Sequence, residues 1–433
     1  MSETTVEVWL GESKLRAGFL VFSEQGQRVW STFRYDDAWL QQKNSWPISP
    51  DLPLRRDWFT KKATSAEDSC FHFAIQDTEP DGWAKQVIHR TFVKEKKAQP
   101  SAKLSRKLSP LDYLLFVDDA SRIGALRFCY PNGEFLGKSI EGRRTTPPML
   151  ELASIINAVK AIELNQETLE DLNYLRGRGS PLGGLRPKCS IINEDNQLCI
   201  GKFPSIKDMR SVTKGEVLAL HLAQNAKIDA AQSKVVGIDG TPVAVITRFD
   251  RTRSGRIPYL SAASLIMADL KENHYYTEIA DVIRQKSPDA NHDLHELWRR
   301  IVFNMLITNV DDHLHNHGFL HNGNGQWRLS PAFDINPFPD KDRELKIWLT
   351  EESGPTGSIK EAVQEANKFN LNHDAAIHIL REVTDAVTHW RKVAASKAIG
   401  MTPTEIEAFE PAFEHEEFEE AKRICSSLIR HLL

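Results

Sequence analysis

Hydrophobic and polar residues alternate in the first part of the chain. The stretch Thr5–Leu10 alternates, and a second apolar stretch, Ala17–Phe22, follows a turn-forming segment. Short runs of this kind are typical of strands, so the two segments predict a β meander. Residues 81–93 place apolar side chains three or four positions apart, which indicates a helix with one buried face. The apolar positions of that helix are Trp83, Val87, Ile88 and Phe92.

The middle and the end of the chain differ in the spacing of their apolar residues. Two predicted strands, 188–192 and 197–203, flank a turn, a helix follows at about 215–226, and a further strand covers 242–249. Beyond residue 260 almost every apolar stretch has the helical period. These stretches are 262–272, 276–284, 294–307, 359–368, 375–396 and 405–433. The pattern predicts an α+β fold in which a strand-containing middle part precedes an all-helical C-terminal lobe, an organisation that resembles a two-lobed nucleotide-binding enzyme.

The length of the chain favours more than one folded part. The sequence has 433 residues, which exceeds the size at which one hydrophobic core usually stops growing. Pro147-Pro148 marks a plausible boundary. We therefore expect a mixed α/β N-terminal domain over 1–146, a β-containing nucleotide-binding lobe over 147–250 and a helical catalytic lobe over 251–433.

Composition and charge are those of an ordinary globular protein. Hydrophobic residues make up 41% and charged residues 26% of the chain. No apolar run approaches the roughly 20 residues that span a bilayer, and the N-terminus lacks the pattern of a signal peptide, so we expect no membrane association. Five scattered cysteines indicate reduced thiols and a cytoplasmic protein. The net charge of -4 argues against a surface that wraps nucleic acid.

The segment 301–337 carries the candidate chemistry. A predicted helix stops at Asn309, and the chain continues Val-Asp-Asp-His-Leu-His-Asn. Within it, Asp311 and Asn316 have the Asp-x-x-x-x-Asn spacing of a protein-kinase catalytic loop. Asp334 follows a short predicted strand, where kinases carry a second metal-binding carboxylate.

Transfer of a γ-phosphoryl group from ATP explains these residue types. Magnesium prefers hard oxygen ligands, so the amide of Asn316 and the carboxylate of Asp334 suit it. The attacking hydroxyl must be oriented and must lose its proton, and the carboxylate of Asp311 suits that role. Further upstream, Lys202 lies on a predicted strand, as a phosphate-pairing lysine should, and Glu216 opens the helix that follows.

Glycines cluster between residues 177 and 184, where a backbone without Cβ atoms can approach a phosphate closely. The cluster is not a Walker loop, because GxxxxGK[ST] is absent.

Taken together and in this order, the motifs resemble the HipA-like serine/threonine kinases of type II toxin–antitoxin systems, over nearly the whole chain. The resemblance implies a two-lobed, protein-kinase-like fold. It also implies a role for each matching position. The positions that resemble the phosphate loop are Gly183, Gly184, Leu185, Arg186, Pro187 and Lys188, and the resemblance implies that Lys202 contacts ATP. The adenine hinge is matched by Thr247, Arg248 and Phe249. The catalytic loop is matched by Asp311, His313, His315 and Asn316, and the second magnesium motif by Phe333 and Asp334.

The same resemblance implies the biology of a toxin. It implies a small HipB-like antitoxin, operator DNA bound through the complex, and a protein substrate such as an aminoacyl-tRNA synthetase. It further implies autophosphorylation of a serine ahead of the glycine-rich loop, for which Ser180 is the nearest candidate. The chain departs from the family at His315, where a lysine is usual. Because histidine titrates near neutral pH, phosphate binding at this corner is expected to differ.

Two other classes of function remain open at this point. His313, His315 and His317, beside the two aspartates, suit a transition-metal hydrolase, and alternate residues on an extended strand would point the same way. A catalytically inactive DNA-binding subunit is the other alternative. The lysine-rich and arginine-rich stretch 94–107, expected to be an exposed loop, would then contact phosphates.

Overall fold

The computed structural model describes most of the chain and divides it into two compact units. It describes residues 2–12, 15–65, 68–80, 82–98, 107–131, 133, 135, 148–178 and 186–427. The first unit comprises Met1–Lys207, Ile238–Thr241 and Asp250–Leu260, and the second comprises Asp208–Gly237, Pro242–Phe249 and Ser261–Leu433. The expected phosphate-loop residues Gly183, Gly184 and Leu185, and the candidate Ser180, lie outside the described residues.

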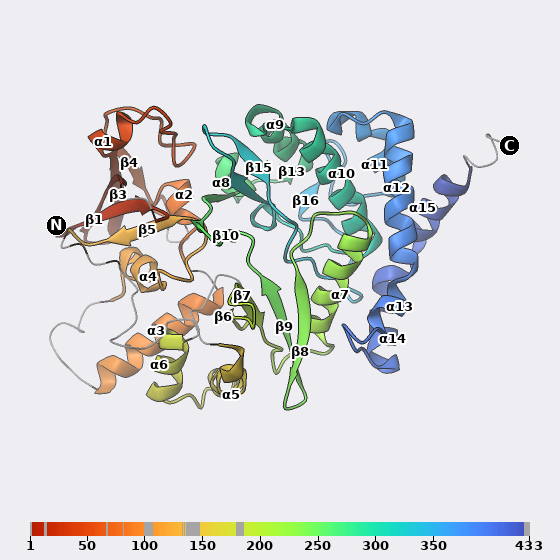
Figure 1. The fold of residues 1–433 in the computed structure, drawn as a ribbon, viewed down its shortest axis with the longest axis horizontal. Coiled ribbons are helices and arrows are strands. Elements are labelled where there is room, and N and C mark those ends of the chain that lie inside the picture. The colour runs from red at the N-terminus through yellow and green to blue at the C-terminus, as the bar shows by residue number, and fades with distance from the viewer. Residues whose placement is uncertain are drawn as a thin grey trace. The chain divides into compact units, whose positions relative to one another are not determined.

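A five-stranded antiparallel sheet in the order β4-β3-β2-β1-β5 forms the start of the first unit (Figure 1). Its strands are β1 (Ser2–Leu10), β2 (Arg16–Gln25), β3 (Arg28–Tyr35), β4 (Phe59–Lys62) and β5 (Leu126–Cys129). Val6 and Val8 are fully buried on β1, as are Leu20 on β2 and Phe33 on β3. The predicted β meander is therefore confirmed.

The helices of the first unit include one that is longer than its sequence pattern suggested. They are α1 (Asp37–Leu40), α2 (Phe73–Gln76), α3 (Gly82–Ala98), α4 (Pro110–Phe116), α5 (Leu152–Glu163) and α6 (Leu169–Arg178), with a 3-10 helix at Met149–Glu151. The basic loop expected from residue 94 is wrong at its start, because α3 continues to Ala98. Arg90 of α3 binds Glu167 at 3.0 Å, and Lys94 donates to the carbonyl of the same residue, which supports the last turns.

Two hairpins complete the first unit. Strands β6 (Lys188–Ile192) and β7 (Leu198–Lys202) pair antiparallel, which confirms the predicted strands and turn, and their register places Lys188 opposite Lys202. The short hairpin β10 (Arg251–Thr252) and β11 (Gly255–Arg256) lies much later in the sequence but belongs to the same unit. Strand β12 (Tyr259–Ser261) follows, where the chain passes into the second unit.

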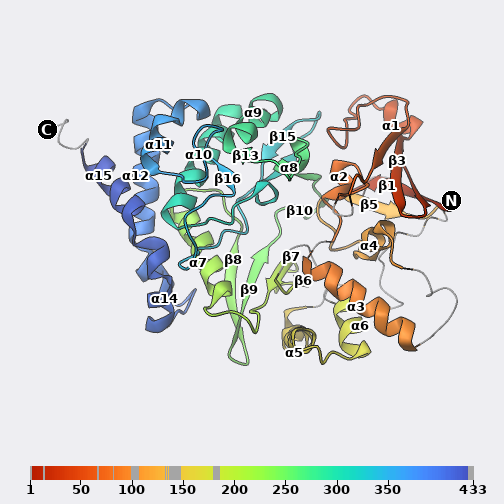
Figure 2. The same cartoon turned by 180° about the vertical axis from the view of Figure 1, so that it is seen from behind.

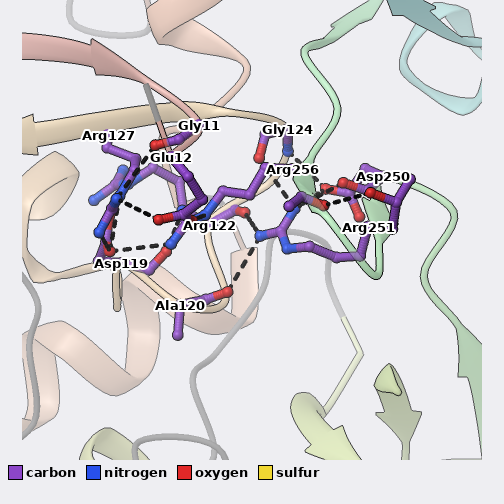
Figure 3. A network of polar contacts seen from close by, with 12 residues as sticks. Gly11, Glu12, Asp119, Ala120, Arg122, Gly124, Arg127, Asp250, Arg251 and Arg256 are labelled. Carbon is purple, nitrogen blue, oxygen red and sulfur yellow. Dashed lines mark hydrogen bonds and ion pairs between the residues drawn. The ribbon is translucent and has the colours of Figure 1, made fainter. Parts of the chain in front are cut away.

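A buried polar network joins the β10–β11 hairpin to the segment 119–127 (Figure 3). Asp119 accepts hydrogen bonds from Arg127, at 2.7 Å from Nη2, and from Arg256, at 3.0 Å. Asp250 accepts the backbone N–H of Gly124 at 2.7 Å. Arg251 donates to three carbonyl oxygens of the same segment: Ala120 at 3.2 Å, Arg122 at 2.6 Å and Gly124 at 3.0 Å. The hairpin is therefore held by charged side chains that bind one another and the backbone of the segment 119–127.

Helices dominate the second unit, in which α12 packs against α10 and against α15 (Figures 1 and 2). The helices are α7 (Val212–Asn225), α8 (Ala262–Leu265), α9 (Tyr276–Lys286), α10 (Ala290–Leu306), α11 (Ile359–Gln364), α12 (His373–Thr388), α13 (Trp390–Ala394), α14 (Pro403–Phe413) and α15 (Glu416–Ser427), with 3-10 helices at Leu314–Asn316 and Ala366–Phe369. The two longest predicted helices are each divided. The stretch from 405 turns at His415, whose Nε2 lies 3.1 Å from the carbonyl oxygen of Leu306.

Short strands interrupt the helices of the C-terminal part, so it is predominantly rather than wholly helical. The second unit contains most of β8 (Ser233–Ile238) and β9 (Thr241–Thr247), together with β13 (His274–Tyr275), β14 (Gly318–His321), β15 (Trp327–Leu329) and β16 (Ile347–Trp348). Strands β14 and β15 form an antiparallel hairpin, whereas β13 and β16 pair parallel. The expected α+β class is confirmed. In the described part of the chain, no helix combines the length and apolarity that a bilayer crossing requires.

Replacement of Gly215 by alanine should destabilise the protein. Alanine favours a helix over glycine by about 1 kcal/mol, but a Cβ at this position of α7 would lie 2.6 Å from the buried ring of Phe409. Overpacking of this kind costs about 1–3 kcal/mol, so we expect a lower midpoint in urea denaturation. Gly237→Ala on β8 is the matched control, because nothing lies within 4 Å of its Cβ position. Equal midpoints for the two variants would contradict this account.

Neutralisation of Asp119 should also destabilise the protein. Asp119→Asn would leave Arg127 and Arg256 without their buried counter-charge, a change that costs about 3 kcal/mol. Glu12→Gln is the control. Glu12 approaches the same two arginines at 3.3 and 3.6 Å, but its side chain is 60% exposed, and exposed pairs contribute about 1 kcal/mol or less.

The contribution of Asp119 to stability should depend on pH in a defined direction. Burial disfavours the charged form of Asp119, but the arginines outweigh burial and hold the pKa of its carboxyl below the ordinary value of 3.8. The stabilisation is therefore fully present above that value and is lost as the pH falls below it. Unfolding of wild type and Asp119→Asn should differ at pH 7 and converge in acid. A difference that persisted unchanged at pH 2 would contradict the assignment.

Candidate active site

The catalytic-loop candidate starts from a defined helix end. Helix α10 closes with Thr308 in the left-handed conformation (φ 54°). The N–H of Asn309 bonds the carbonyl of Asn304 at 2.8 Å, and the N–H of Thr308 bonds that of Met305 at 3.4 Å. This pair of bonds is the Schellman motif, which satisfies the last carbonyls of a helix and turns the chain sharply. The direction of the loop that follows is therefore set by the backbone of α10.

A buried carboxylate fixes the middle of the loop. Asp312 is 5% exposed and accepts hydrogen bonds from the hydroxyl of Tyr276 at 2.5 Å and the amide of Asn304 at 3.0 Å, while Nε2 of His317 lies 2.8 Å from it. Burial disfavours its ionisation, but the adjacent imidazole outweighs burial and holds the pKa of Asp312 below its usual range. Burial and the same carboxylate raise the pKa of Tyr276. Asp312 is thus a structural anion that holds the two ends of the loop together.

A chain of asparagines continues from this cluster to the second metal motif. Asn304 accepts a hydrogen bond from the side-chain amide of Asn309 at 3.1 Å, and Asn309 in turn accepts the backbone N–H of Asn336 at 3.3 Å. The amide of Asn336 donates to Asp334 at 3.4 Å. The end of α10 therefore positions both the catalytic loop and the segment that carries Asp334.

Asp311 differs from its neighbour Asp312 in its exposure to solvent and in its binding partners. Its side chain is 40% exposed and forms an ion pair with the ammonium of Lys346, and Lys341 lies 4.0 Å from the same carboxylate oxygen. Adjacent residues of identical type thus have different environments. Asp312 is enclosed by its partners, whereas Asp311 is accessible to a substrate.

The expected metal ligands, Asn316 and Asp334, belong to the same unit as Asp311. The side-chain nitrogen of Asn316 donates to the carbonyl of Asp311 at 3.4 Å, so its amide oxygen faces away from that carbonyl, as a metal ligand requires. Asp334 adopts a left-handed backbone (φ 55°), which is uncommon outside glycine and clusters at functional sites. Burial lowers the pKa of His313, the repulsion of His315 adds to this, and the carboxylates of Asp312 and Asp334 oppose it. Oxygen donors from an amide and a carboxylate fit magnesium.

The histidine-cluster alternative loses its structural basis. Residues 314–316 form a 3-10 turn, so the extended strand that would bring the three histidines together is wrong. The rings of His313 and His315 are 5.8 Å apart, but His317 is buried and bound to Asp312. Among the residues that the structure describes, no group of three or more His, Cys, Asp or Glu side chains is arranged to hold a metal ion.

The candidate hinge contacts the second metal motif within the same unit. The rings of Phe249 and Phe333 lie 5.4 Å apart at an interplanar angle of 46°. The backbone N–H of Thr247 bonds the carbonyl of Gln232 at 2.8 Å, and Arg248 is only 7% exposed. Two motifs 84 positions apart in the sequence are thus packed together.

The remaining described phosphate candidates belong to the first unit. Lys188 and Lys202 are cross-strand partners at the end of the β6–β7 hairpin, so their side chains share a face of the sheet. Arg186 and Pro187 directly precede β6, and the N–H of Phe203 bonds the carbonyl of Pro187 at 3.0 Å. The hairpin therefore brings Lys188 and Lys202 side by side, and the assignment of these residues to ATP stays a prediction.

Sequence reasoning missed two residues of the site. Asp312 was grouped with Asp311, and nothing in the sequence distinguishes a buried from an exposed aspartate at adjacent positions. Lys346 was not considered at all. The signal that would have found it is the alternation of apolar Leu345, Ile347 and Leu349 around it, which predicts a strand with Lys346 on the opposite face.

Comparison with known families identifies both parts of the chain. Residues 6–106 match the model of the HipA N-terminal domain, and residues 180–390 match that of the HipA-like C-terminal domain. The second match contains the whole candidate site, from the glycine-rich loop to Asp334.

Curated relatives are distant. A protein of Haemophilus influenzae named "Putative kinase" is 24% identical over 188 residues, which are 38% of this chain and 55% of that protein. "Putative kinase Y4mE" of Sinorhizobium fredii is 23% identical over 324 residues, 70% of this chain and 71% of the relative. The chain thus spans little more than half the length of the first relative and about seven tenths of the second.

A solved structure shares the fold. It is a chain of the Shewanella oneidensis MR-1 toxin–antitoxin complex of HipA, HipB and operator DNA, with a TM-score of 0.67 and 15% identity, covering 98% of this chain and 97% of that chain. This likeness confirms the expected HipA-like fold. With both domain models matched in order and the fold shared along its length, the chain belongs to the HipA-like family.

Proposed function

We propose that this protein is a magnesium-dependent kinase that transfers the γ-phosphate of ATP to a serine or threonine hydroxyl of a protein. One observation carries the proposal. The exposed carboxylate of Asp311 and the amide of Asn316 belong to one short loop, and the polar network at the end of α10 holds both this loop and the segment that carries Asp334. The Asp-x-x-x-x-Asn spacing is that of a protein-kinase catalytic loop.

Asp311 acts on the hydroxyl of the protein substrate. Its carboxylate orients the hydroxyl and takes its proton as the oxygen attacks the γ-phosphorus. The new bond joins the substrate oxygen to that phosphorus, the bond from phosphorus to the bridging oxygen breaks, and the electron pair leaves with ADP. The reaction needs no further reactant. Because Asp312 is enclosed by three partners, it does not compete with Asp311 for the proton.

Asn316 and Asp334 would hold magnesium, which neutralises charge on the phosphate oxygens when it is bound. For the nucleotide, we assign its phosphates to Lys202, Lys188, Arg186, Pro187 and the glycine-rich residues Gly183 to Leu185. We assign adenine to the segment Thr247–Phe249, and the environment of the transferring phosphate to His313 and His315. The packing of Phe249 on Phe333 supports this assignment, because it joins the adenine segment to the magnesium motif.

We further propose that the kinase is the toxin of a toxin–antitoxin pair. A HipB-like antitoxin would bind it, and the complex would bind operator DNA and repress its own operon. The similar Shewanella oneidensis chain comes from a complex of HipA, HipB and operator DNA, which supports this proposal. The substrate would be a translation factor such as an aminoacyl-tRNA synthetase, and phosphorylation of Ser180 would silence the enzyme.

Asp311→Asn should abolish phosphoryl transfer while the protein remains folded. Loss of a general base costs about 10²–10⁴-fold in rate, so label from γ-labelled ATP on the protein or on a serine-containing substrate should fall below detection. EDTA should abolish transfer by the wild type, and Asp334→Asn should raise the magnesium concentration needed for it. Asp195→Asn is the control, because Asp195 lies in an exposed turn of the first unit. Full activity of Asp311→Asn would refute the assignment.

Expression without a partner should stop bacterial growth. The arrest should depend on Asp311, because phosphorylation of a translation factor requires catalysis, and co-expression of a cognate antitoxin should relieve it. Colony counts and protein levels measure both effects. Unchanged growth with stable protein that is active in vitro would refute toxicity and leave the kinase proposal intact.

A further inference from the structure

The catalytic loop contains no lysine or arginine of its own. Residues 309–317 read Asn-Val-Asp-Asp-His-Leu-His-Asn-His, so any permanent positive charge must come from another segment. Phosphoryl transfer places negative charge on the oxygens of the moving group, and fixed cations stabilise that charge. The described residues that bring lysine to Asp311 are Lys346 and Lys341.

The backbone aims Lys346 at the loop. Strand β16 pairs parallel with β13, with Ile347 opposite His274, and the N–H of Leu345 bonds the carbonyl of Pro355 at 2.8 Å. Leu345, Ile347 and Leu349 are 8%, 1% and 0% exposed, so this face of the segment lies in the core. Lys346 lies between Leu345 and Ile347, at the bend that precedes β16, and its exposed side chain is directed away from the core. Its position is therefore set by pairing and packing rather than by the ion pair itself.

The two lysines are not equivalent. Lys346 is in direct contact with Oδ1 of Asp311, and its side chain is 54% exposed. The ammonium of Lys341 is 4.0 Å from the same oxygen and lies 3.8 Å from the centre of the Phe338 ring, a cation–π contact. Lys341 thus has an aromatic partner of its own, whereas the ammonium of Lys346 is paired with Asp311.

We propose that Lys346 is a catalytic residue that donates hydrogen bonds to the γ-phosphate oxygens during transfer. The inference rests on the proposed kinase function and deepens it. In the substrate-free protein the ammonium binds Asp311. When substrates are bound, it turns to the phosphate oxygens and frees the carboxylate for the substrate hydroxyl. Lys346 keeps its own proton throughout, since the hydroxyl proton passes to Asp311 and the leaving electron pair to ADP.

The half-exposed positions of both side chains allow this exchange. An ion pair between partly exposed groups contributes about 1 kcal/mol or less, so a phosphate with several negative oxygens readily displaces the carboxylate. The four-carbon stem of lysine lets the ammonium move between acceptors while the backbone, next to β16, stays in place. The same pair thereby keeps Asp311 in place before the substrate arrives.

Kinetics of matched variants test the catalytic role. For Lys346→Ala we expect kcat to fall about 10²-fold, with the KM for ATP within about threefold of wild type, because the contact strengthens in the transition state. Lys346→Arg keeps the charge and should recover most of the loss. Lys368→Ala is the control, since Lys368 lies in an exposed pair with Glu365 and Glu352. A kcat that rose in Lys346→Ala would show that the pair only blocks Asp311, and an unchanged kcat would show that it has no role; either result overturns the proposal.

A chemical measurement tests the same inference without turnover. Acetic anhydride should modify Lys346 several-fold more slowly when magnesium and a non-hydrolysable ATP analogue are present, and Lys368 should react equally in both conditions. Asp311→Asn should speed the reaction of Lys346 in the free protein, because the ion pair is lost. If Lys346 were not protected while the analogue bound, as calorimetry would show, the proposal would fail even in an active kinase. Absence of analogue binding would instead contradict the kinase function itself.

Discussion

The geometry of the candidate site depends on the hydrogen bonds of one buried carboxylate, that of Asp312. It receives donors from α9, from α10 and from the residue that follows the 3-10 turn, so three separate segments meet at one anion. A buried charge is tolerated only when it is paired and hydrogen-bonded, and here those requirements are met by residues that also define the course of the loop. Any displacement of the loop would leave this charge without partners. The hydrogen bonds of the buried Asp312 therefore fix the backbone of the loop that carries the exposed Asp311.

Local sequence patterns predicted the residues of the candidate site, but they did not predict how the environments of those residues differ. The helical period of α10 and the spacing of Asp311 and Asn316 predicted a kinase-like loop, and these are local properties that a single segment records. The hairpin of Lys188 and Lys202 was likewise readable from alternation. In contrast, the division of labour between Asp311 and Asp312 depends on Tyr276, which lies 36 positions upstream. Which of two adjacent aspartates is buried depends on contacts between segments far apart in the sequence, and the pattern of one segment carries no information about those contacts.

Tertiary contacts also explain where the predicted elements were wrong. Helix α3 runs on through lysines that read as a loop because Glu167, far along the chain, binds Arg90 and Lys94. The helices predicted from 375 and from 405 are interrupted where side chains reach other segments. The histidines at 313, 315 and 317 looked like a metal cluster only while the segment was taken as extended. The turn at 314–316 prevents the three side chains from pointing the same way, and His317 is already paired with Asp312.

The hairpin β10–β11 has a consequence for how the molecule is made. It completes the polar network of the first unit, yet it follows two segments, Asp208–Gly237 and Pro242–Phe249, that belong to the second. During synthesis the N-terminal segments leave the ribosome first, but Asp119 gains its bond to Arg256 only after more than half of the chain has been translated. Until then a buried carboxylate and the carbonyls of the 120–124 segment lack part of their partners. Each unit is thus built from several separate segments of the sequence. Neither unit can be complete before part of the other has been translated, and neither can be expressed by itself from one contiguous gene fragment.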